Sequence, residues 1–148
     1  MSGRRITPLL LTISSVVLLF LCMGLLCACS NDTAISTRNE SYKAVDGYYQ
    51  ITQAKAKELM DNEKNYIILD VRTAEEFSEK HIENAVLIPV TEIEERAEKE
   101  LTDKGQLILV YCRSGNRSKT ASKSLAELGY TNVMEFGGIN NWIYGTVK

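Results

Sequence analysis

Short apolar runs alternate with amphipathic stretches from about residue 48 to the end of the chain. The apolar runs are rich in β-branched residues, as expected of strands, and cover residues 48–51, 66–70, 85–88, 107–111 and 133–136. The first run is expected at the sheet edge, whereas the continuous apolar character of 66–70 is typical of a buried parallel strand. Strands that alternate with helices predict an α/β fold, with a mostly parallel sheet covered by helices on both faces.

Capping residues mark where helices begin between these strands. Thr52 can cap a helix that runs to about residue 62. Two capping boxes, in which Thr is followed three residues later by Glu, predict further helices. They are Thr73 with Glu76, before a short helix to about Lys80, and Thr91 with Glu94, before a helix to Leu101.

The last long helix is expected over residues 118–128. Ala121, Leu125 and Leu128 lie on one face of it, and Gly129 follows as a residue suited to the left-handed conformation that ends helices. A short helix around Trp142 would close the domain. Trp142 is most simply a core residue.

Residues 1–28 have the layout of a secretory signal peptide. Arg4 and Arg5 precede an uninterrupted apolar run, and the sequence Leu-Cys-Ala-Cys ends at Cys29. This ending resembles the bacterial lipobox, which implies cleavage before Cys29 and lipidation of its side chain. The alternative is an uncleaved transmembrane anchor, because residues 6–28 are long enough to span a bilayer. Both interpretations place the domain on the extracytoplasmic side of a membrane.

Residues 29–47 are polar, so we expect a flexible tether that is followed by a domain over residues 48–148. Loss of Arg4 and Arg5 with the signal peptide leaves 15 of the 17 basic residues against 19 acidic ones, a net charge of −4. The sequence shows no basic stripe, so nucleic acid is not an expected partner. We expect a monomeric domain.

The candidate chemistry lies directly after strand 107–111, where the apolar run ends in Cys112. A loop of small and cationic residues follows: Arg113, Ser114, Gly115, Asn116, Arg117 and Ser118. Gly115 and Asn116 tolerate positive φ, so the loop can curl back over the cysteine and point successive N–H groups at one place. The strand–loop–helix arrangement is the one that α/β proteins use to hold an anion or a reactive atom.

Each of these features favours the thiolate form of Cys112. Backbone N–H groups, the positive end of the following helix dipole and the two arginines should all lower the pKa of the thiol. An inert buried cysteine is the alternative, but packing alone does not explain two arginines and a glycine after it. We therefore interpret Cys112 as an activated nucleophile.

Cysteine usage agrees with a catalytic thiol. Cys22 and Cys27 would leave with the signal peptide and Cys29 would carry lipid, so Cys112 remains as the free thiol and no disulfide forms within one mature chain. Since His81 is the only histidine, the sequence holds no Cys/His set with zinc-ligand spacing. No metal or other cofactor is expected.

Several separated motifs occur in order along the domain. They are Leu69-Asp70-Val71-Arg72, Glu76-Phe77, His81-Ile82, Ala85, Ile88-Pro89, the loop from Tyr111 to Ser118, Gly137-Gly138 and Trp142. Together they resemble the single-domain rhodanese family over about residues 51–145. The resemblance implies an α/β sandwich around a five-stranded, mostly parallel sheet. Lys80 and Asn84 depart from the family, which usually has glycine at both positions; Asn84 can still adopt positive φ, whereas Lys80 suggests a differently built turn before His81.

The resemblance also implies covalent sulfur transfer in two steps. The Cys112 thiolate would attack the outer sulfur of a donor such as thiosulfate, release sulfite and hold the sulfur as a persulfide within the loop N–H groups of residues 113–118. An acceptor thiol, or cyanide in an assay, would then remove that sulfur. Arg113 and Arg117 would bind the anionic donor, unless they are solvated loop charges.

Three other residues of the motifs are expected to support the site. Asp70 and Arg72 would orient loops through buried hydrogen bonds. His81 is expected to be structural, because a preformed thiolate needs no base.

Other functions stay open on the sequence. A rhodanese-like domain could act as a non-catalytic binding module at the membrane, or as a persulfide carrier whose donor is a protein or a polysulfide. Phosphatases and arsenate reductases use a related loop, but the tyrosine-phosphatase signature places its arginine six positions after the cysteine. Here Ser118 holds that position and Arg117 comes one residue too early.

Overall fold

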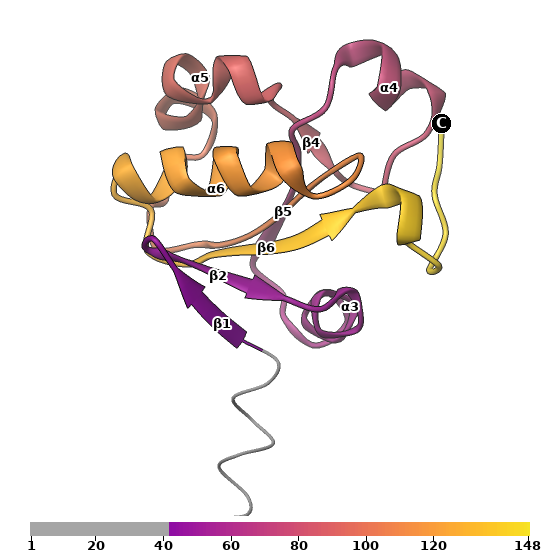
Figure 1. The fold of residues 1–148 in the computed structure, drawn as a ribbon, viewed down its shortest axis with the longest axis horizontal. Coiled ribbons are helices and arrows are strands. Elements are labelled where there is room, and N and C mark those ends of the chain that lie inside the picture. The colour runs from indigo at the N-terminus through magenta and orange to yellow at the C-terminus, as the bar shows by residue number, and fades with distance from the viewer. Residues whose placement is uncertain (1–41) are drawn as a thin grey trace, which may run out of the picture. The chain divides into compact units, whose positions relative to one another are not determined.

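The computed structural model describes residues 42–148 (Figure 1). The predicted signal peptide, the lipidation site Cys29 and residues 29–41 of the predicted tether lie outside this range. Within residues 42–148, no helix has the length and apolar character needed to cross a membrane.

A six-stranded sheet forms the centre of the domain, with strand order β1-β2-β6-β5-β3-β4. All neighbouring pairs are parallel except β1 and β2. The strands are β1 (Tyr42–Val45), β2 (Tyr48–Ile51), β3 (Tyr66–Asp70), β4 (Val86–Leu87), β5 (Leu107–Cys112) and β6 (Val133–Gly138). The α/β class and the mostly parallel sheet are as predicted.

The number of strands is one more than the sequence suggested, because β1 precedes the expected edge strand. β1 lies in a stretch assigned to the tether, yet it pairs antiparallel with β2 along its whole length. Asp46 and Gly47 connect the two strands with φ angles of 45° and 84°. An Asp-Gly pair at a two-residue hairpin turn is the sequence signal that could have identified β1. The edge position thus belongs to β1 and not to β2.

Helices cover both faces of the sheet, with α3 on one face and α5 and α6 on the other (Figure 1). Their bounds, with the short 3₁₀ helices η1 and η2, are α3 (Gln53–Asn62), α4 (Ala74–Glu79), η1 (Val90–Glu92), α5 (Ile93–Glu100), α6 (Asn116–Glu127) and η2 (Ile139–Asn141).

Side chains of β5 alternate between the two hydrophobic cores, as the pleat of a strand requires. Ile108, Val110 and Cys112 pack in the core beneath α5 and α6. Leu109 and Tyr111 pack in the core beneath α3. This alternation directs the sulfur of Cys112 to the face that α6 covers.

Two of the three predicted helix starts are confirmed. Thr52 caps α3, and Thr73 with Glu76 forms the capping box of α4. The predicted box of Thr91 with Glu94 is wrong, because Thr91 lies inside η1 and α5 begins only at Ile93. Proline fixes φ near the helical value, and the Pro89 carbonyl accepts a hydrogen bond from the N–H of Glu92 (2.8 Å), which starts the 3₁₀ turn before Thr91 could act as a cap.

The remaining elements follow the predicted pattern with shifted ends. Helix α6 begins two residues earlier than expected, and Gly129 adopts the left-handed conformation (φ 90°) after the C-cap residue Leu128. Trp142 follows η2 as a half-buried residue that packs against Phe136 rather than as a fully buried one.

Candidate active site

Cys112 is the last residue of β5, at the edge of the sheet where parallel strands end. Its side chain is almost completely buried (1% exposed), and its Sγ accepts a hydrogen bond from the N–H of Gly115 at 3.1 Å. Burial raises the pKa of the Cys112 thiol. The nearby hydroxyl and the amide of Ser118, with the amides of Gly115 and Ser114, more than offset burial, so the pKa of the thiol is lowered overall.

The loop after Cys112 curls through one left-handed residue. Gly115 has φ 105° and precedes α6, whereas Asn116, expected to share the positive φ, is the first helical residue. The amide of Ser118 therefore belongs to the first turn of α6. Free N–H groups of that turn point toward negative charge, which fits a thiolate at its end.

Gly138 in β6 lets the loop lie directly on the sheet. A Cβ atom at this position would lie 2.4 Å from the carbonyl oxygen of Arg113 and 2.6 Å from the Cα of Ser114. The backbone N–H of Asn140 also donates to the Arg113 oxygen at 3.3 Å. Gly138 of the Gly137-Gly138 motif is thus a packing requirement of the cysteine loop, whereas Gly137 has a positive φ of 94°.

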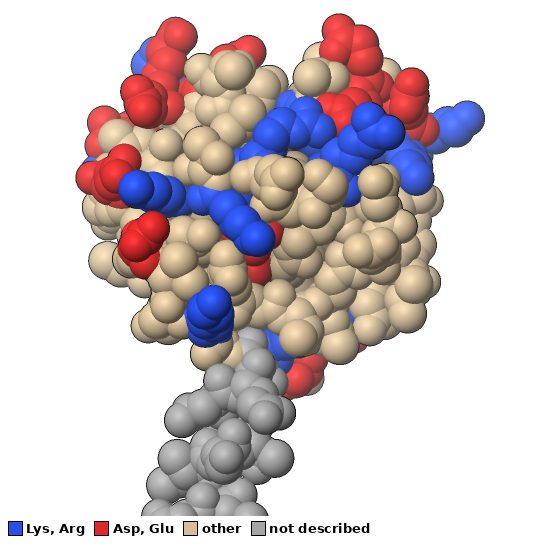
Figure 2. Space-filling view, in the orientation of Figure 1, with Lys and Arg blue, Asp and Glu red and all other residues tan. Residues whose placement is uncertain are grey.

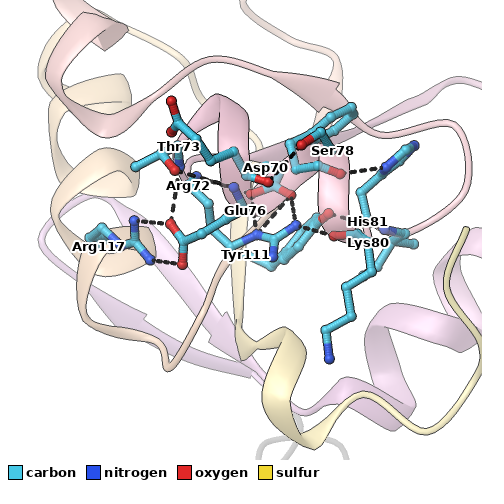
Figure 3. Close-up of polar contacts among 12 residues, drawn as sticks. Asp70, Arg72, Thr73, Glu76, Ser78, Lys80, His81, Tyr111 and Arg117 are labelled. Carbon is cyan, nitrogen blue, oxygen red and sulfur yellow. Dashed lines mark hydrogen bonds and ion pairs between the residues drawn. The ribbon is translucent and has the colours of Figure 1, made fainter. Parts of the chain in front are cut away.

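The two loop arginines differ in their surroundings. Arg117 donates to both carboxylate oxygens of Glu76 in α4, at 2.6 and 2.8 Å (Figure 3). The Arg117 hydrogen bonds hold the pKa of Glu76 well below its usual range, at about 2. Arg113 is exposed, and its guanidinium makes no hydrogen bond or ion pair with any residue of the described domain. Arg113 is therefore the loop cation that is free to meet an anion.

Asp70 and Arg72 form a buried ion pair beside this loop (Figure 3). Arg72 Nη2 donates to Asp70 Oδ2 at 2.6 Å and to the carbonyl of Lys80 at 2.7 Å. The Arg72 guanidinium also lies 5.6 Å from the ring centre of Tyr111, whose hydroxyl accepts from the N–H of Ile82. These contacts fix the segment between β3 and β4.

His81 stabilises the end of α4. Its ring stacks on Phe77, with centroids 3.9 Å apart, and its Nδ1 lies 3.0 Å from the Phe77 carbonyl oxygen. Lys80, just before it, has an extended backbone (φ −167°), so glycine is not needed there. Asn84 adopts the positive φ (63°) that the sequence suggested.

Glu135 of β6 belongs to the site although the sequence motifs did not include it. Only 3% of the residue is exposed, and its Oε1 accepts from the Ser118 hydroxyl at 2.6 Å and from the Gly137 N–H at 2.8 Å. An acidic residue inside the apolar run of a strand was the available signal, because carboxylates are rarely buried without a specific partner.

A polar cleft of about 360 Å³ adjoins the loop at the same edge of the sheet. Gln53, Ser114, Lys119, Glu135 and Asn141 contribute to its walls. Gln53 also donates to the carbonyl of Gly138 at 2.7 Å. The cleft gives solvent and small molecules a route to the backbone that supports Cys112.

Positive charge gathers on the face that holds the loop and α6, and acidic side chains lie around its rim (Figure 2). In residues 42–148, no group of three or more His, Cys, Asp or Glu side chains is arranged to hold a metal ion.

Comparisons with known proteins show similarity to one family. Residues 52–144 match the family described as Rhodanese-like domain. Thiosulfate sulfurtransferase PspE of Escherichia coli is 36% identical over 80 residues, which cover 54% of this chain and 77% of that protein. Thiosulfate sulfurtransferase GlpE of Coxiella burnetii is 34% identical over 96 residues, 64% of this chain and 87% of that protein.

Solved structures show the same fold. A rhodanese with anions from E. coli is 35% identical, with a TM-score of 0.53 over 56% of this chain and 98% of that one. A rhodanese-related protein from Thermoplasma volcanium is 33% identical, with a TM-score of 0.57 over 66% of this chain and 96% of that one.

Proposed function

The chain belongs to the rhodanese-like domain family, and from that premise we propose that it is a sulfurtransferase that carries sulfane sulfur on Cys112. The observation that carries the proposal is the buried thiol with a lowered pKa at the centre of amide donors. The names of its relatives, two thiosulfate sulfurtransferases and a putative sulfur carrier protein of Bacillus subtilis, support sulfur as the group that moves.

In the first step the Cys112 thiolate attacks the outer sulfur of thiosulfate. A new S–S bond forms, the S–S bond of thiosulfate breaks, and sulfite leaves with the bonding electron pair. The persulfide keeps one negative charge, which the amides of Ser114, Gly115 and Ser118 stabilise. Arg113, the unpaired loop cation of the described domain, attracts the dianionic donor.

In the second step an acceptor thiolate attacks the outer sulfur of the persulfide. The acceptor gains the sulfur, and Cys112 leaves as a thiolate, ready for another cycle. The same loop amides that stabilise the persulfide stabilise this leaving group. No metal or organic cofactor enters either step.

Mass spectrometry after incubation with thiosulfate tests the proposal directly. We expect the peptide that contains Cys112 to gain the mass of one sulfur atom, and to lose it again on addition of cyanide. The Cys112→Ser variant, which should keep the fold, is the matched control and should gain nothing. A folded wild-type protein that takes up no sulfur from thiosulfate or a polysulfide would point instead to a non-catalytic binding module.

We also propose that the domain is held at the outer face of a membrane by a lipid on Cys29. The support is the order of features in residues 1–29, where two arginines are followed by an apolar run and then by Leu-Cys-Ala-Cys. Metabolic labelling with a fatty acid should mark the wild type and leave Cys29→Ser unlabelled. Equal labelling of both proteins would rule out the lipid on Cys29 and favour the transmembrane alternative.

A further inference from the structure

We propose that Glu135 is a positioning residue for Cys112, which acts by holding the hydroxyl proton of Ser118 and so withholds one hydrogen bond from the sulfur. The inference rests on the proposed role of Cys112 as the sulfur carrier. It concerns a side chain that makes no hydrogen bond or ion pair with the sulfur or with the loop arginines.

Glu135 is buried in a way that calls for a reason. Only 3% of it is exposed, and no ion pair joins it to a Lys or Arg among residues 42–148. A buried carboxylate without a cationic partner is costly unless hydrogen bonds compensate. Its Oε1 atom receives two: from the Ser118 hydroxyl at 2.6 Å and from the Gly137 amide at 2.8 Å.

The hydroxyl of Ser118 has a single hydrogen and several acceptors around it. Besides Glu135, they are the Gly115 carbonyl at 3.0 Å, the Gly137 carbonyl at 3.5 Å and the sulfur of Cys112. The 2.6 Å contact has the length of a charge-assisted O–H···O⁻ bond. Because Oε1 also accepts from the Gly137 amide, it acts as an acceptor toward both partners. The hydroxyl hydrogen therefore lies toward Glu135, and the sulfur keeps its amide donors.

This arrangement sets the balance between a stable thiolate and a reactive one. Each added hydrogen bond lowers the pKa of a thiol, but nucleophilicity falls with the pKa, and the best attacking thiol has a pKa near ambient pH. The amides of Ser118, Gly115 and Ser114 each act to lower the pKa of Cys112, against burial, which raises it. By retaining the Ser118 proton, Glu135 keeps the sulfur from being stabilised so far that it attacks slowly.

Other charged groups face these side chains and stay constant in the test. Tyr48 of β2 and Lys119 of α6 lie near Glu135. Arg117, which pairs with Glu76, also interacts electrostatically with Cys112 and with Asp70, the partner of Arg72. Differences between variants at Glu135 and Ser118 thus report on those two residues.

The test compares the full-length wild type with Glu135→Gln, Ser118→Ala and the double variant. A glutamine carbonyl can still accept from the Gly137 amide, while its NH₂ donates to Ser118 and frees the hydroxyl for the sulfur. Each folded protein is alkylated with iodoacetamide at a series of pH values. The rate is then read from the peptide that contains Cys112, isolated after digestion, so that the other cysteines do not interfere. We expect the midpoint of the alkylation rate against pH to lie about half a pH unit or more lower in Glu135→Gln than in the wild type.

In the Ser118→Ala background the same glutamine substitution should shift the midpoint much less. An unchanged midpoint in Glu135→Gln overturns the proposal, and so does an equal shift in both backgrounds, which would mean that the charge of Glu135 acts without Ser118. Should Glu135→Gln fail to fold, Glu135→Asp serves instead, because it keeps the charge but shortens the reach to Ser118; the midpoint should again fall, and an unchanged midpoint overturns the proposal.

Sulfur loading from thiosulfate is measured on the same samples. Absence of loading with the expected midpoints would refute the sulfurtransferase proposal and leave the role of Glu135 intact. Normal loading with unshifted midpoints would refute the role of Glu135 and leave the sulfurtransferase proposal intact.

Discussion

Arg117 and Glu76 lie opposite each other at the junction of α6 and α4, with two guanidinium nitrogens on the two carboxylate oxygens at 2.6 and 2.8 Å (Figure 3). Glu76 also accepts from the N–H of Thr73 as part of the capping box of α4. Arg117, which the family resemblance implied as a donor-binding residue, therefore links the cysteine loop to the neighbouring helix. This leaves Arg113 as the better candidate for contact with the donor.

The ion pair predicts how stability depends on pH. The pKa of Glu76 is lowered from 4.5 to about 2, so the pair stabilises the fold fully above the unfolded value and is lost as the pH falls toward 2. Both side chains are partly exposed, and we expect Glu76→Gln to lower the free energy of unfolding by about 1 kcal/mol at neutral pH. Denaturant unfolding should show this gap closing at acid pH.

The exposed Glu79 of the same helix provides a control for that measurement. Glu79→Gln should change the free energy of unfolding very little at any pH. A gap between wild type and Glu76→Gln that stays constant down to about pH 2 would contradict the role assigned to the carboxylate.

The contrast between the two arginines predicts a separation of binding from stability. Arg113→Ala should raise KM for thiosulfate several-fold, with the effect shrinking at high salt, and leave the melting temperature near that of the wild type. Arg117→Ala should lower the melting temperature, because it leaves Glu76 without its partner. Steady-state kinetics and thermal unfolding of the two variants distinguish these effects.

Lys123, an exposed cation further along α6, is the matched control for loss of charge. If Arg113→Ala raised KM no more than Lys123→Ala does, general surface charge and not the loop arginine would attract the donor.

Gly138 predicts a severe packing defect. Its replacement by alanine would bring a methyl group within 2.4 Å of a backbone oxygen of the cysteine loop, so the loop or β6 must move. We expect Gly138→Ala to lose about 1–3 kcal/mol in the free energy of unfolding and to load sulfur poorly. The matched change Gly105→Ala, whose Cβ would meet its nearest neighbour at 3.4 Å, should fold and load sulfur like the wild type.

Local rules in the sequence predicted most of the fold. The five apolar runs located β2, β3, β4, β5 and β6, and two helix starts followed from Thr52 and from Thr73 with Glu76. The error at Thr91 arose because a proline two residues earlier started a 3₁₀ turn, which a pattern of cap residues does not register. The strand β1 was missed because its alternating, half-exposed residues resemble a polar linker.

The candidate site was predictable only as far as it is contiguous in sequence. Cys112 and its loop follow one another directly, so their composition indicated the chemistry. The partner of Arg117 lies 41 residues away in α4, and Glu135 of β6 contacts Ser118 of α6. Such pairings depend on how strands and helices pack, which spacing along the chain does not encode.

The buried pair of Asp70 and Arg72 makes a prediction that separates the contribution of charge from that of hydrogen bonding. Both side chains are inaccessible, at 0% and 3% exposure, so Asp70→Asn leaves an uncompensated guanidinium in the interior. We expect it to lose about 3–5 kcal/mol in the free energy of unfolding. In Asp70→Asn with Arg72→Gln, the asparagine oxygen can still accept from the backbone N–H of residue 72, as Asp70 Oδ1 does at 3.0 Å.

The double variant should therefore lose less stability than the sum of the two single variants, because no unpaired charge stays buried in it. Urea unfolding of the four proteins in this double-mutant cycle measures the coupling. Additive losses would mean that the two charges do not compensate each other, and that Arg72 stabilises the segment through its bond to the Lys80 carbonyl instead. In that case Arg72→Gln alone should cost as much in the Asp70→Asn background as it does in the wild type.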